Sequence, residues 1–407
     1  MRKEILIASV LTLMITLSVL AQTSRRAVSP PTAPTQKTNM VAALSLYSWQ
    51  VRPNVADGYF SSDIPQPVCA FVNGVPKIFI FTNFTYYPSV NLMNQSNAVR
   101  VGEITTPADT YQLLPHNLPG ARQEFAATSV LKPGNNDHTI YIFGGKNASG
   151  DLDEVYSYTE SAGFQFVTNI PARLGKAGAR AGAVALPANG MIYLFGGAQN
   201  GNSVLNQVLE FDPQQGQFTN KTLTMPVGFH GARGMTKAVG TRNYIYLVGA
   251  RTTPYGAPNS LIYRFDVLNG VTDTVKDLNN PTADLSIPGG SGYPMITWDP
   301  SGAIRIIAAS GSIGPWTWAN IQAWVLTDNY SLPNNGRGTL TAAPYNNAAR
   351  ARDMAGAVKC GSSTYLIGGT NGHSPTFQNP GMFVDRLIDN TYGPVNSQIN
   401  SSIKKNF

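Results

Sequence analysis

One residue type recurs at a fixed distance from a repeated strand pattern. Three arginines each lie 13 residues before a tyrosine in an apolar stretch such as MIYLF, and they are Arg180, Arg233 and Arg352. A guanidinium presents its N–H donors in a planar fork that matches carboxylate, sulfate and phosphate groups. Arg122 in LPGARQEF is a fourth candidate, displaced by the longer turn KPGNNDHT. If the fold brings these side chains together, they form an anion-binding site.

Aromatic and imidazole side chains occur near these arginines or in the loops predicted to share their face. Trp316 and Trp318 alternate in SGSIGPWTWANIQ, and His373 lies in GTNGHSPTFQNPG. His230 precedes Arg233 by three positions. Aromatic rings beside arginines suit a sugar or peptide ligand, because a ring packs against a flat apolar face. Alternatively, the tryptophans cap the edge of a sheet and the histidines are ordinary loop residues.

Six apolar stretches share the pattern that contains these tyrosines. They are PKIFIFTN (76–83), TIYIFGGK (139–146), MIYLFGGA (191–198), YIYLVGAR (244–251), AIRIIAAS (303–310) and STYLIGGT (363–370). Their equivalent positions are Phe79, Tyr141, Tyr193, Tyr246, Arg305 and Tyr365, with spacings of 62, 52, 53, 59 and 60 residues. Repeats of about 50 residues predict the blades of a β-propeller, with loop insertions in the longer units.

Each unit is predicted to contain four strands. In the third unit they are 181–186, 191–195, 207–212 and 217–225, with the turns PANG and PQQG between them. Short strands bounded by Gly, Pro, Asn or Asp are typical of a protein built from strands and turns. No run with a helical period follows residue 40, so the sequence predicts an all-β fold.

The repeat resembles the kelch motif, in which an apolar strand ends in Gly-Gly and two aromatic residues follow about seven positions apart. In the third unit the diglycine at 196–197 is followed by Phe211 and Phe218. Diglycines also stand at 144–145 and 368–369, whereas units one and five depart from the pattern. The resemblance covers roughly residues 44–388. It implies a secreted six-bladed kelch-type β-propeller of the galactose oxidase/kelch-type superfamily.

A strand that runs into Gly-Gly also begins many phosphate-binding loops. Such a loop opens a helix and usually carries Lys-Ser/Thr. Here another strand follows, and the glycine pair recurs along the chain. The glycines are therefore interpreted as residues that permit close packing where strands converge, and not as a nucleotide site.

A propeller must close its ring of blades. The sixth unit ends after its third strand, 381–388, while the stretch LSLYSWQVRP (44–53) has the pattern of a fourth strand. We predict that this N-terminal strand completes the last blade, which joins the two ends of the domain and avoids an open sheet edge. The predicted propeller domain spans residues 41–388.

The propeller fold predicts where a ligand binds. If a to d number the strands of a blade from the axis outward, the b–c loops and d–a connections lie on one face. The arginines precede strand a in their units, so Arg122, Arg180, Arg233 and Arg352 are predicted to ring one mouth of the central channel. Alternatively, each arginine ties adjacent blades together by bonding backbone carbonyls.

The ends of the chain are predicted to lie outside the propeller. Arg2 and Lys3 precede a stretch of 17 apolar residues ending in Val-Leu-Ala, which is typical of a secretory signal peptide over residues 1–21. The alternative is an uncleaved membrane anchor, since this length approaches that of a membrane span. Residues 22–40 are a Pro/Ser/Thr-rich spacer expected to be disordered, and 389–407 form a polar tail. We expect an extracellular protein without a membrane span in its mature chain.

The two cysteines are Cys69 and Cys360. An oxidising compartment permits a disulfide. Cys69 lies ten residues before Phe79, and Cys360 lies five before Tyr365. This offset corresponds to roughly 16 Å along neighbouring strands, beyond the reach of a disulfide. Two free buried thiols are therefore favoured, unless the alignment of the first unit is wrong.

Six Asn-x-Ser/Thr sequons are candidate glycosylation sites in an exported chain. They are Asn83, Asn94, Asn147, Asn220, Asn329 and Asn400.

The charge and the residue inventory argue against several function classes. The formal charge of +7 arises from scarce acids and not from basic runs, which argues against nucleic-acid binding. Copper chemistry like that of galactose oxidase needs a Tyr cross-linked to Cys, a second Tyr and two His ligands. The chain has four His and no Tyr-His dipeptide, and their spacing predicts no metal site. The Ser-x-Asp-x-Gly-x-Thr-Trp turn of sialidases is also absent.

The sequence therefore predicts a non-catalytic binding module that acts as a monomer without cofactor or metal. Its expected partner is an extracellular protein or glycan. The hypothesised ligand is an anionic glycan or an acidic peptide at the arginine-lined mouth. The alternatives are a carbohydrate oxidase relative, active or inactive, and a structural wall or matrix protein.

Overall fold

The structure of the protein is a computed structural model, and the residues that it describes lie between 47 and 389. Within these limits the described residues exclude 52–65, 88–91, 106–109, 172–183, 200–202, 254–258, 289–293, 300–301, 315–316, 330–336, 343–355 and 368–383, and the single positions 121, 123, 133, 135, 148, 222 and 229. All described residues belong to one unit, Ser45–Phe407.

The described residues form six sheets of four or five strands, which we call blades 1 to 6 in chain order, and two further two-stranded sheets. Blade 1 contains β2 (Gln66–Val72), β3 (Val75–Tyr87), β4 (Leu92–Thr105) and β5 (Thr110–Leu118). Blade 2 contains β6 (Ala126–Leu131), β7 (His138–Phe143), β10 (Glu154–Thr159) and β11 (Gly163–Asn169). Blade 3 contains β12 (Val184–Ala188), β13 (Met191–Phe195), β16 (Gln207–Asp212), β17 (Gln217–Phe218) and β18 (Leu223–Thr224).

The second half of the chain continues in the same order. Blade 4 contains β19 (Arg233–Val239), β20 (Arg242–Val248), β21 (Tyr263–Asp266) and β22 (Val271–Thr274). Blade 5 contains β24 (Met295–Trp298), β25 (Ile304–Gly314), β26 (Thr317–Asn329) and β27 (Arg337–Ala342), with β23 (Lys276–Asp277) added in parallel to β27. Blade 6 contains β28 (Gly356–Cys360), β29 (Ser363–Ile367) and β30 (Val384–Asp389).

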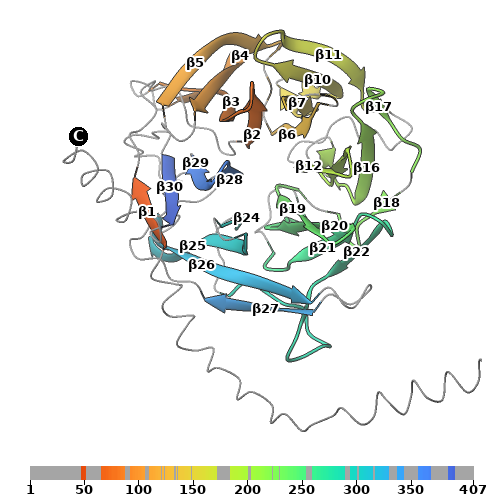
Figure 1. Ribbon diagram of the computed structural model, residues 1–407, viewed down its shortest axis with the longest axis vertical. Helices are drawn as coiled ribbons and strands as arrows, with labels where there is room; N and C mark the ends of the chain where they lie inside the picture. The colour runs from red at the N-terminus through yellow and green to blue at the C-terminus, as the bar shows by residue number, and fades with distance from the viewer. Residues whose placement is uncertain are drawn as a thin grey trace, which may run out of the picture. The chain divides into compact units, whose positions relative to one another are not determined.

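The six blades surround a common axis, with one strand of each blade innermost (Figure 1). The innermost strands β2, β6, β12, β19, β24 and β28 each pack against the innermost strand of the next blade, and β28 packs against β2. The predicted six-bladed β-propeller is therefore confirmed, and the described residues contain no helix.

An N-terminal strand closes the ring, as the sequence predicted. β1 (Tyr47–Val51) pairs antiparallel with β30, from Tyr47 opposite Asp389 to Val51 opposite Asp385. It is thereby the outermost strand of blade 6, whose other strands come from the opposite end of the chain. This pairing joins the first and last strands of the propeller.

Each interface between neighbouring blades contains its own apolar core. In β13, Ile192 and Leu194 pack toward blade 2, while Tyr193 and Phe195 pack toward blade 4. All four are at most 3% exposed. Successive side chains of a strand point to opposite faces, so a strand with two buried faces needs a continuous apolar run. This explains why the repeat consists of runs such as MIYLF without polar alternation.

The diglycine after the second strand is required by the backbone conformation of the turn that follows the strand. Both glycines adopt positive φ, 56° and 97° at Gly144–Gly145 and 59° and 101° at Gly196–Gly197. The second residue of each pair then accepts a backbone bond, from Leu152 at 2.9 Å and from Leu205 at 2.8 Å. Left-handed backbone at two consecutive positions favours glycine because a Cβ atom is strained there. A short hairpin follows each pair, β8–β9 (Lys146–Asn147 and Gly150–Asp151) or β14–β15 (Ala198–Gln199 and Ser203–Val204).

Two details of the third unit differ from the sequence-based prediction. β12 continues through Pro187 and Ala188, so the turn consists of Asn189 and Gly190, both at positive φ. The outer strand predicted over 217–225 is interrupted, and β17 and β18 pair separately with β16.

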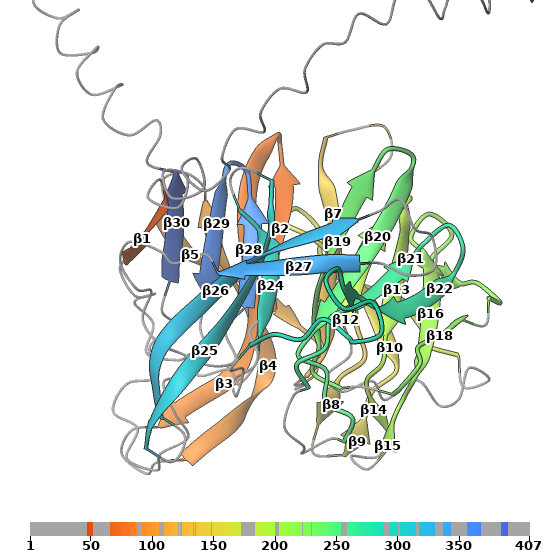
Figure 2. The same ribbon diagram turned by 90° about the horizontal axis from the view of Figure 1, so that it is seen from below.

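The second and third strands of blades 1 and 5 are longer than those of the other blades. β3 and β4 contain 13 and 14 residues, and β25 and β26 contain 11 and 13. Because the innermost strands begin opposite Phe81 and Ile307, both hairpins continue beyond them (Figure 2).

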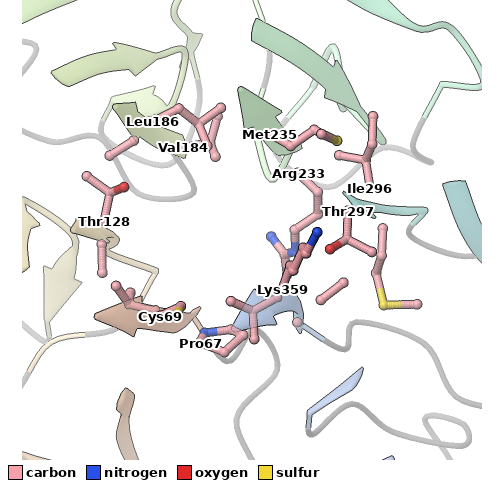
Figure 3. A pocket seen from close by; sticks show the side chains of 18 of the residues that line it. Pro67, Cys69, Thr128, Val184, Leu186, Arg233, Met235, Ile296, Thr297 and Lys359 are labelled. Atoms are coloured by element: carbon pink, nitrogen blue, oxygen red, sulfur yellow. The ribbon is translucent and has the colours of Figure 1, made fainter. Parts of the chain in front are cut away.

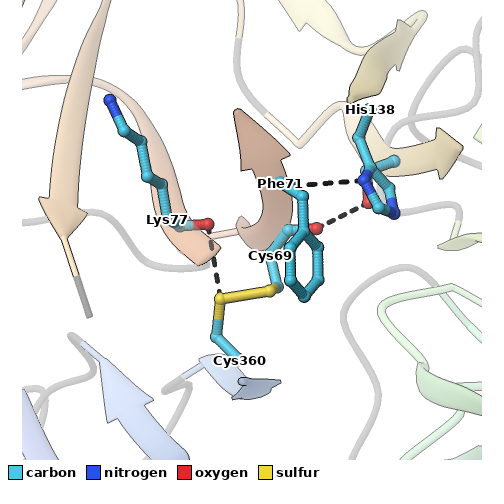
Figure 4. The surroundings of a disulfide bond; sticks show 6 residues. Cys69, Phe71, Lys77, His138 and Cys360 are labelled. Atoms are coloured by element: carbon cyan, nitrogen blue, oxygen red, sulfur yellow. Dashed lines mark hydrogen bonds between the residues drawn. A yellow bond between two sulfur atoms is a disulfide. The ribbon is translucent and has the colours of Figure 1, made fainter. Parts of the chain in front are cut away.

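A disulfide joins Cys69 in β2 to Cys360 in β28, with 5.3 Å between the Cα atoms (Figure 4). The expectation of two free thiols is therefore wrong. Val68 is opposite Phe79, and Val358 is opposite Tyr365. Cys69 is one residue beyond Val68 and Cys360 is two residues beyond Val358, so the two cysteines differ by only one position along their strands. The distance along the chain from each cysteine to Phe79 or Tyr365 passes through the turn of the hairpin, and the first two strands of blade 1 are longer than those of blade 6.

Candidate functional site

The innermost strands of all six blades surround a cavity of about 260 Å³ (Figure 3). Each blade contributes consecutive residues of its innermost strand, from Pro67–Cys69 in blade 1 to Gly356–Lys359 in blade 6. The cavity therefore occupies the central channel, the site where a propeller places residues from different blades side by side.

The described residues that line this channel include two cations and no carboxylate. The cations are Arg233, the first residue of β19, and Lys359, near the end of β28. Figure 3 shows the side chain of Arg233 reaching into the space between the strands. Because innermost strands run in the same direction along the axis, Arg233 lies nearer one end of the channel and Lys359 nearer the other.

The rest of the lining is apolar or weakly polar. Thr128, Ser129 and Thr297 supply hydroxyl groups, of which Ser129 Oγ donates to the carbonyl of Cys69 at 2.6 Å. Trp298 lies at the end of β24, and the ammonium of Lys237 is 5.2 Å from its ring centroid. Burial lowers the pKa of Lys237. The described lining therefore combines the two cationic side chains with hydroxyl groups and apolar side chains.

Arg233 is half-buried, and its Nη1 donates to the carbonyl of Ala232 at 3.4 Å. It is the one candidate arginine that the structure places on the channel wall within the described part of the chain. Arg180 and Arg352 lie outside the described residues, so their place at the mouth stays a prediction.

Arg122 has the contacts expected of a residue that ties segments together. It is 2% exposed, and it donates to the carbonyls of Gly144 at 3.2 Å and Pro119 at 3.4 Å. Its guanidinium lies 3.5 Å from Glu154 and 5.0 Å from the ring centroid of Tyr156. These contacts favour the alternative interpretation of this arginine, in which it bonds backbone carbonyls.

His230 belongs to a hydrogen-bonded cluster that the sequence did not indicate. Its Nε2 is 3.1 Å from Glu124, and Lys146 Nζ binds the other oxygen of that carboxylate at 2.7 Å. The cluster links the segment before β6 to the segment before β19, which belong to blades 2 and 4. No local signal identified Glu124, because its partner His230 is 106 residues away in the chain.

The carboxylate of Glu124 is held in its charged form. Burial raises the pKa of this group, but the hydrogen bonds from His230 and Lys146 outweigh that effect and lower the pKa to about 2. Glu124 also adopts φ of 54°, an uncommon conformation for a residue with a side chain. At neutral pH the carboxylate therefore accepts a hydrogen bond from His230 Nε2.

The remaining candidates are only partly placed. Trp318 is opposite Ser312 in the β25–β26 hairpin, whereas Trp316 and His373 lie outside the described residues. Among the sequons, Asn220 and Asn329 are exposed, and Asn147 is half-buried and accepts from the Ser149 amide. Asn83 and Asn94 fall in β3 and β4, and Asn400 lies outside the described residues.

Within the described ranges, no three His, Cys, Asp or Glu side chains are grouped so that they could hold a metal ion. The same residues include no helix of sufficient length and apolarity to cross a membrane. What the described channel offers chemically is a set of hydrogen-bond donors and positive charge.

Comparisons with known proteins bear on the fold. No family model matches the sequence, and no curated protein matches it. Among solved structures, the chain is similar to the one titled "Structure of YjhT", with 16% sequence identity and a TM-score of 0.53. The likeness covers 83% of this chain and 98% of that chain. The chain thus has the fold of a six-bladed β-propeller, while membership of the kelch family stays a prediction.

Proposed function

We propose that the protein is an exported binding protein, without catalytic activity, that takes an anionic ligand at the end of the channel where Arg233 lies. The observation that carries this proposal is the channel lining, which contains Arg233 and Lys359 and no described carboxylate. The expected ligands are an anionic glycan or an acidic peptide. The propeller itself is compatible with both binding modules and enzymes, since a fold does not determine function.

The chemistry of the two cations supports an anion. An arginine can bind a carboxylate or sulfate through two parallel N–H bonds, and a lysine adds a mobile point charge. Inside a channel with apolar walls these charges are screened less than on an open surface. The net charge of +7 also draws anions toward the molecule.

Replacement of Arg233 by glutamine is expected to weaken retention on immobilised acidic glycans and acidic peptides by between about 10- and 150-fold. This range corresponds to the loss of one hydrogen bond to a charged group. Lys359→Gln, nearer the other end of the channel, is expected to weaken retention less, through the long-range potential alone, and higher salt should weaken binding by the unmodified protein. Glycan and peptide arrays probed with each purified protein measure the effect.

Arg242→Gln is the matched control for Arg233→Gln. Arg242 lies at the other end of the same hairpin, opposite Val239, and its removal changes the net charge equally. Equal losses of retention in the two variants would mean that the effect of Arg233→Gln arises from the change in net charge alone. Unchanged retention in Arg233→Gln and Lys359→Gln, with both proteins folded, would refute the proposal.

A further inference from the structure

A polar crevice lies between blades 1 and 2, at the end of the blades opposite to Arg233. It encloses about 390 Å³ and is lined by His138, Asn73, Lys132, Asp137 and Glu160 among others. His138 is the first residue of β7 and is half-buried. The crevice gives solvent protons access to a histidine at the seam between two blades.

His138 accepts a hydrogen bond from the backbone of the neighbouring blade. The amide of Phe71 in β2 donates to His138 Nδ1 at 3.2 Å (Figure 4). The two rings stack with centroids 5.3 Å apart and an angle of 27° between their planes. Because Nδ1 accepts this bond, the neutral imidazole must carry its proton on Nε2.

We propose that His138 is an acid-sensitive clasp between blades 1 and 2. When the imidazole takes a proton from solvent at Nδ1, it changes from acceptor to donor, and the amide of Phe71 loses its partner. Two N–H groups then face each other, so the seam opens locally as the solution is acidified. The step is a reversible protonation and needs no other reactant.

The charges around the crevice determine the direction of the response. Burial lowers the pKa of His138 below its ordinary value of 6.5, while the carboxylate of Asp137 opposes this effect. Lys132 lies on the same wall, and Glu160 across the crevice is paired with Lys77 at 2.7 Å. The folded protein therefore favours the neutral ring. The stabilisation by this group is complete above pH 6.5 and is lost as the pH falls toward the lower pKa of the folded state.

The clasp holds a strand that also forms the channel wall. Two residues before Phe71, Cys69 lines the channel, accepts a bond from Ser129 Oγ and forms the disulfide to blade 6. Protonation of His138 thus removes one of several attachments of β2. The expected result is local opening near Phe71 while the disulfide holds the ring closed.

Hydrogen exchange at the Phe71 amide tests this proposal. The protection factor, corrected for intrinsic exchange, is expected to fall between pH 7.5 and 5.5, by at most about tenfold for each unit separating the two pKa values. In His138→Asn the side-chain oxygen can take the place of Nδ1 without titrating. Phe71 should then stay protected at both pH values, and the unfolding free energy should depend less on pH.

His116→Asn is the matched control, because His116 Nδ1 contacts the Tyr158 hydroxyl at 3.4 Å and not a backbone amide. That variant should keep the pH response of the unmodified protein at Phe71. An NMR titration of His138 in the unmodified protein gives a second readout that does not depend on folding of a variant. Protection at Phe71 that is the same at pH 7.5 and 5.5, or a His138 pKa above 6.5, would overturn the proposal.

Discussion

Replacing Asp328 by alanine is expected to lower the free energy of unfolding by up to about 3–5 kcal/mol, because the buried cation of Arg264 then keeps only the more distant carboxylate of Asp273, at 3.9 Å. Arg264 Nη1 lies 2.9 Å from Asp328, and the two side chains are 1% and 0% exposed. The hydroxyl of Tyr246 donates to the same carboxylate oxygen. The three residues come from β20, β21 and β26, so the network joins blades 4 and 5. Urea unfolding at neutral pH measures the loss.

Two comparisons distinguish this effect from a general sensitivity to charge removal. Asp284→Ala removes a carboxylate whose pair with Lys276 is about one-third exposed, so about 1 kcal/mol or less is expected. Replacing both Arg264 and Asp328 by Met and Leu removes the charges together, and this variant should lose much less than Asp328→Ala. If Asp328→Ala and Asp284→Ala lose the same free energy of unfolding, the buried pair of Arg264 and Asp328 does not stabilise the contact between blades 4 and 5.

Removal of the disulfide is expected to cost about 2–5 kcal/mol, toward the upper end because the bond closes a very long loop. The two cysteines are 291 positions apart and connect the first blade to the last. Without the bond, the unfolded chain has more conformational entropy, because the two distant segments are no longer held together. The variant with both Cys69 and Cys360 replaced by alanine should unfold at lower denaturant concentration than the oxidised protein.

Reduction of the unmodified protein provides the control for this variant. Treatment with a thiol reductant should move its unfolding midpoint toward that of the double-alanine variant, while the variant itself should not respond to reductant. Equal midpoints for the oxidised protein and the variant would show that strand β1, and not the disulfide, supplies the closure of the ring.

The fold could be predicted from the sequence because the propeller repeats the same blade arrangement six times. Each second strand has two buried faces, so it must be apolar throughout, and the same requirement returns in every blade. Even the departures in units one and five kept their spacing, since blades 1 and 5 still place β3 and β25 second from the axis. The closing strand β1 was identifiable because blade 6 lacked a fourth strand of its own.

The candidate site was less predictable because it depends on contacts between distant segments. A fixed spacing before Tyr246 directed attention to Arg233, which lies on the channel wall. Similar reasoning selected Arg122, whose guanidinium is bonded to carbonyls of nearby loops. Spacing gives the position of a residue in its blade, but not whether another group has already taken its hydrogen bonds.

The sequence by itself determined the architecture: apolar periodicity, the interval between repeats and the missing outer strand are properties of the chain read in order. Only the tertiary structure decided which distant residues meet. It paired Cys69 with Cys360, placed Glu124 against His230 and set His138 against the amide of Phe71. Strand periodicity is a local property, whereas these contacts depend on hairpin lengths and on the relative height of neighbouring strands. A shift of two residues along a strand moves a side chain by about 7 Å, which is enough to make or prevent each of these bonds.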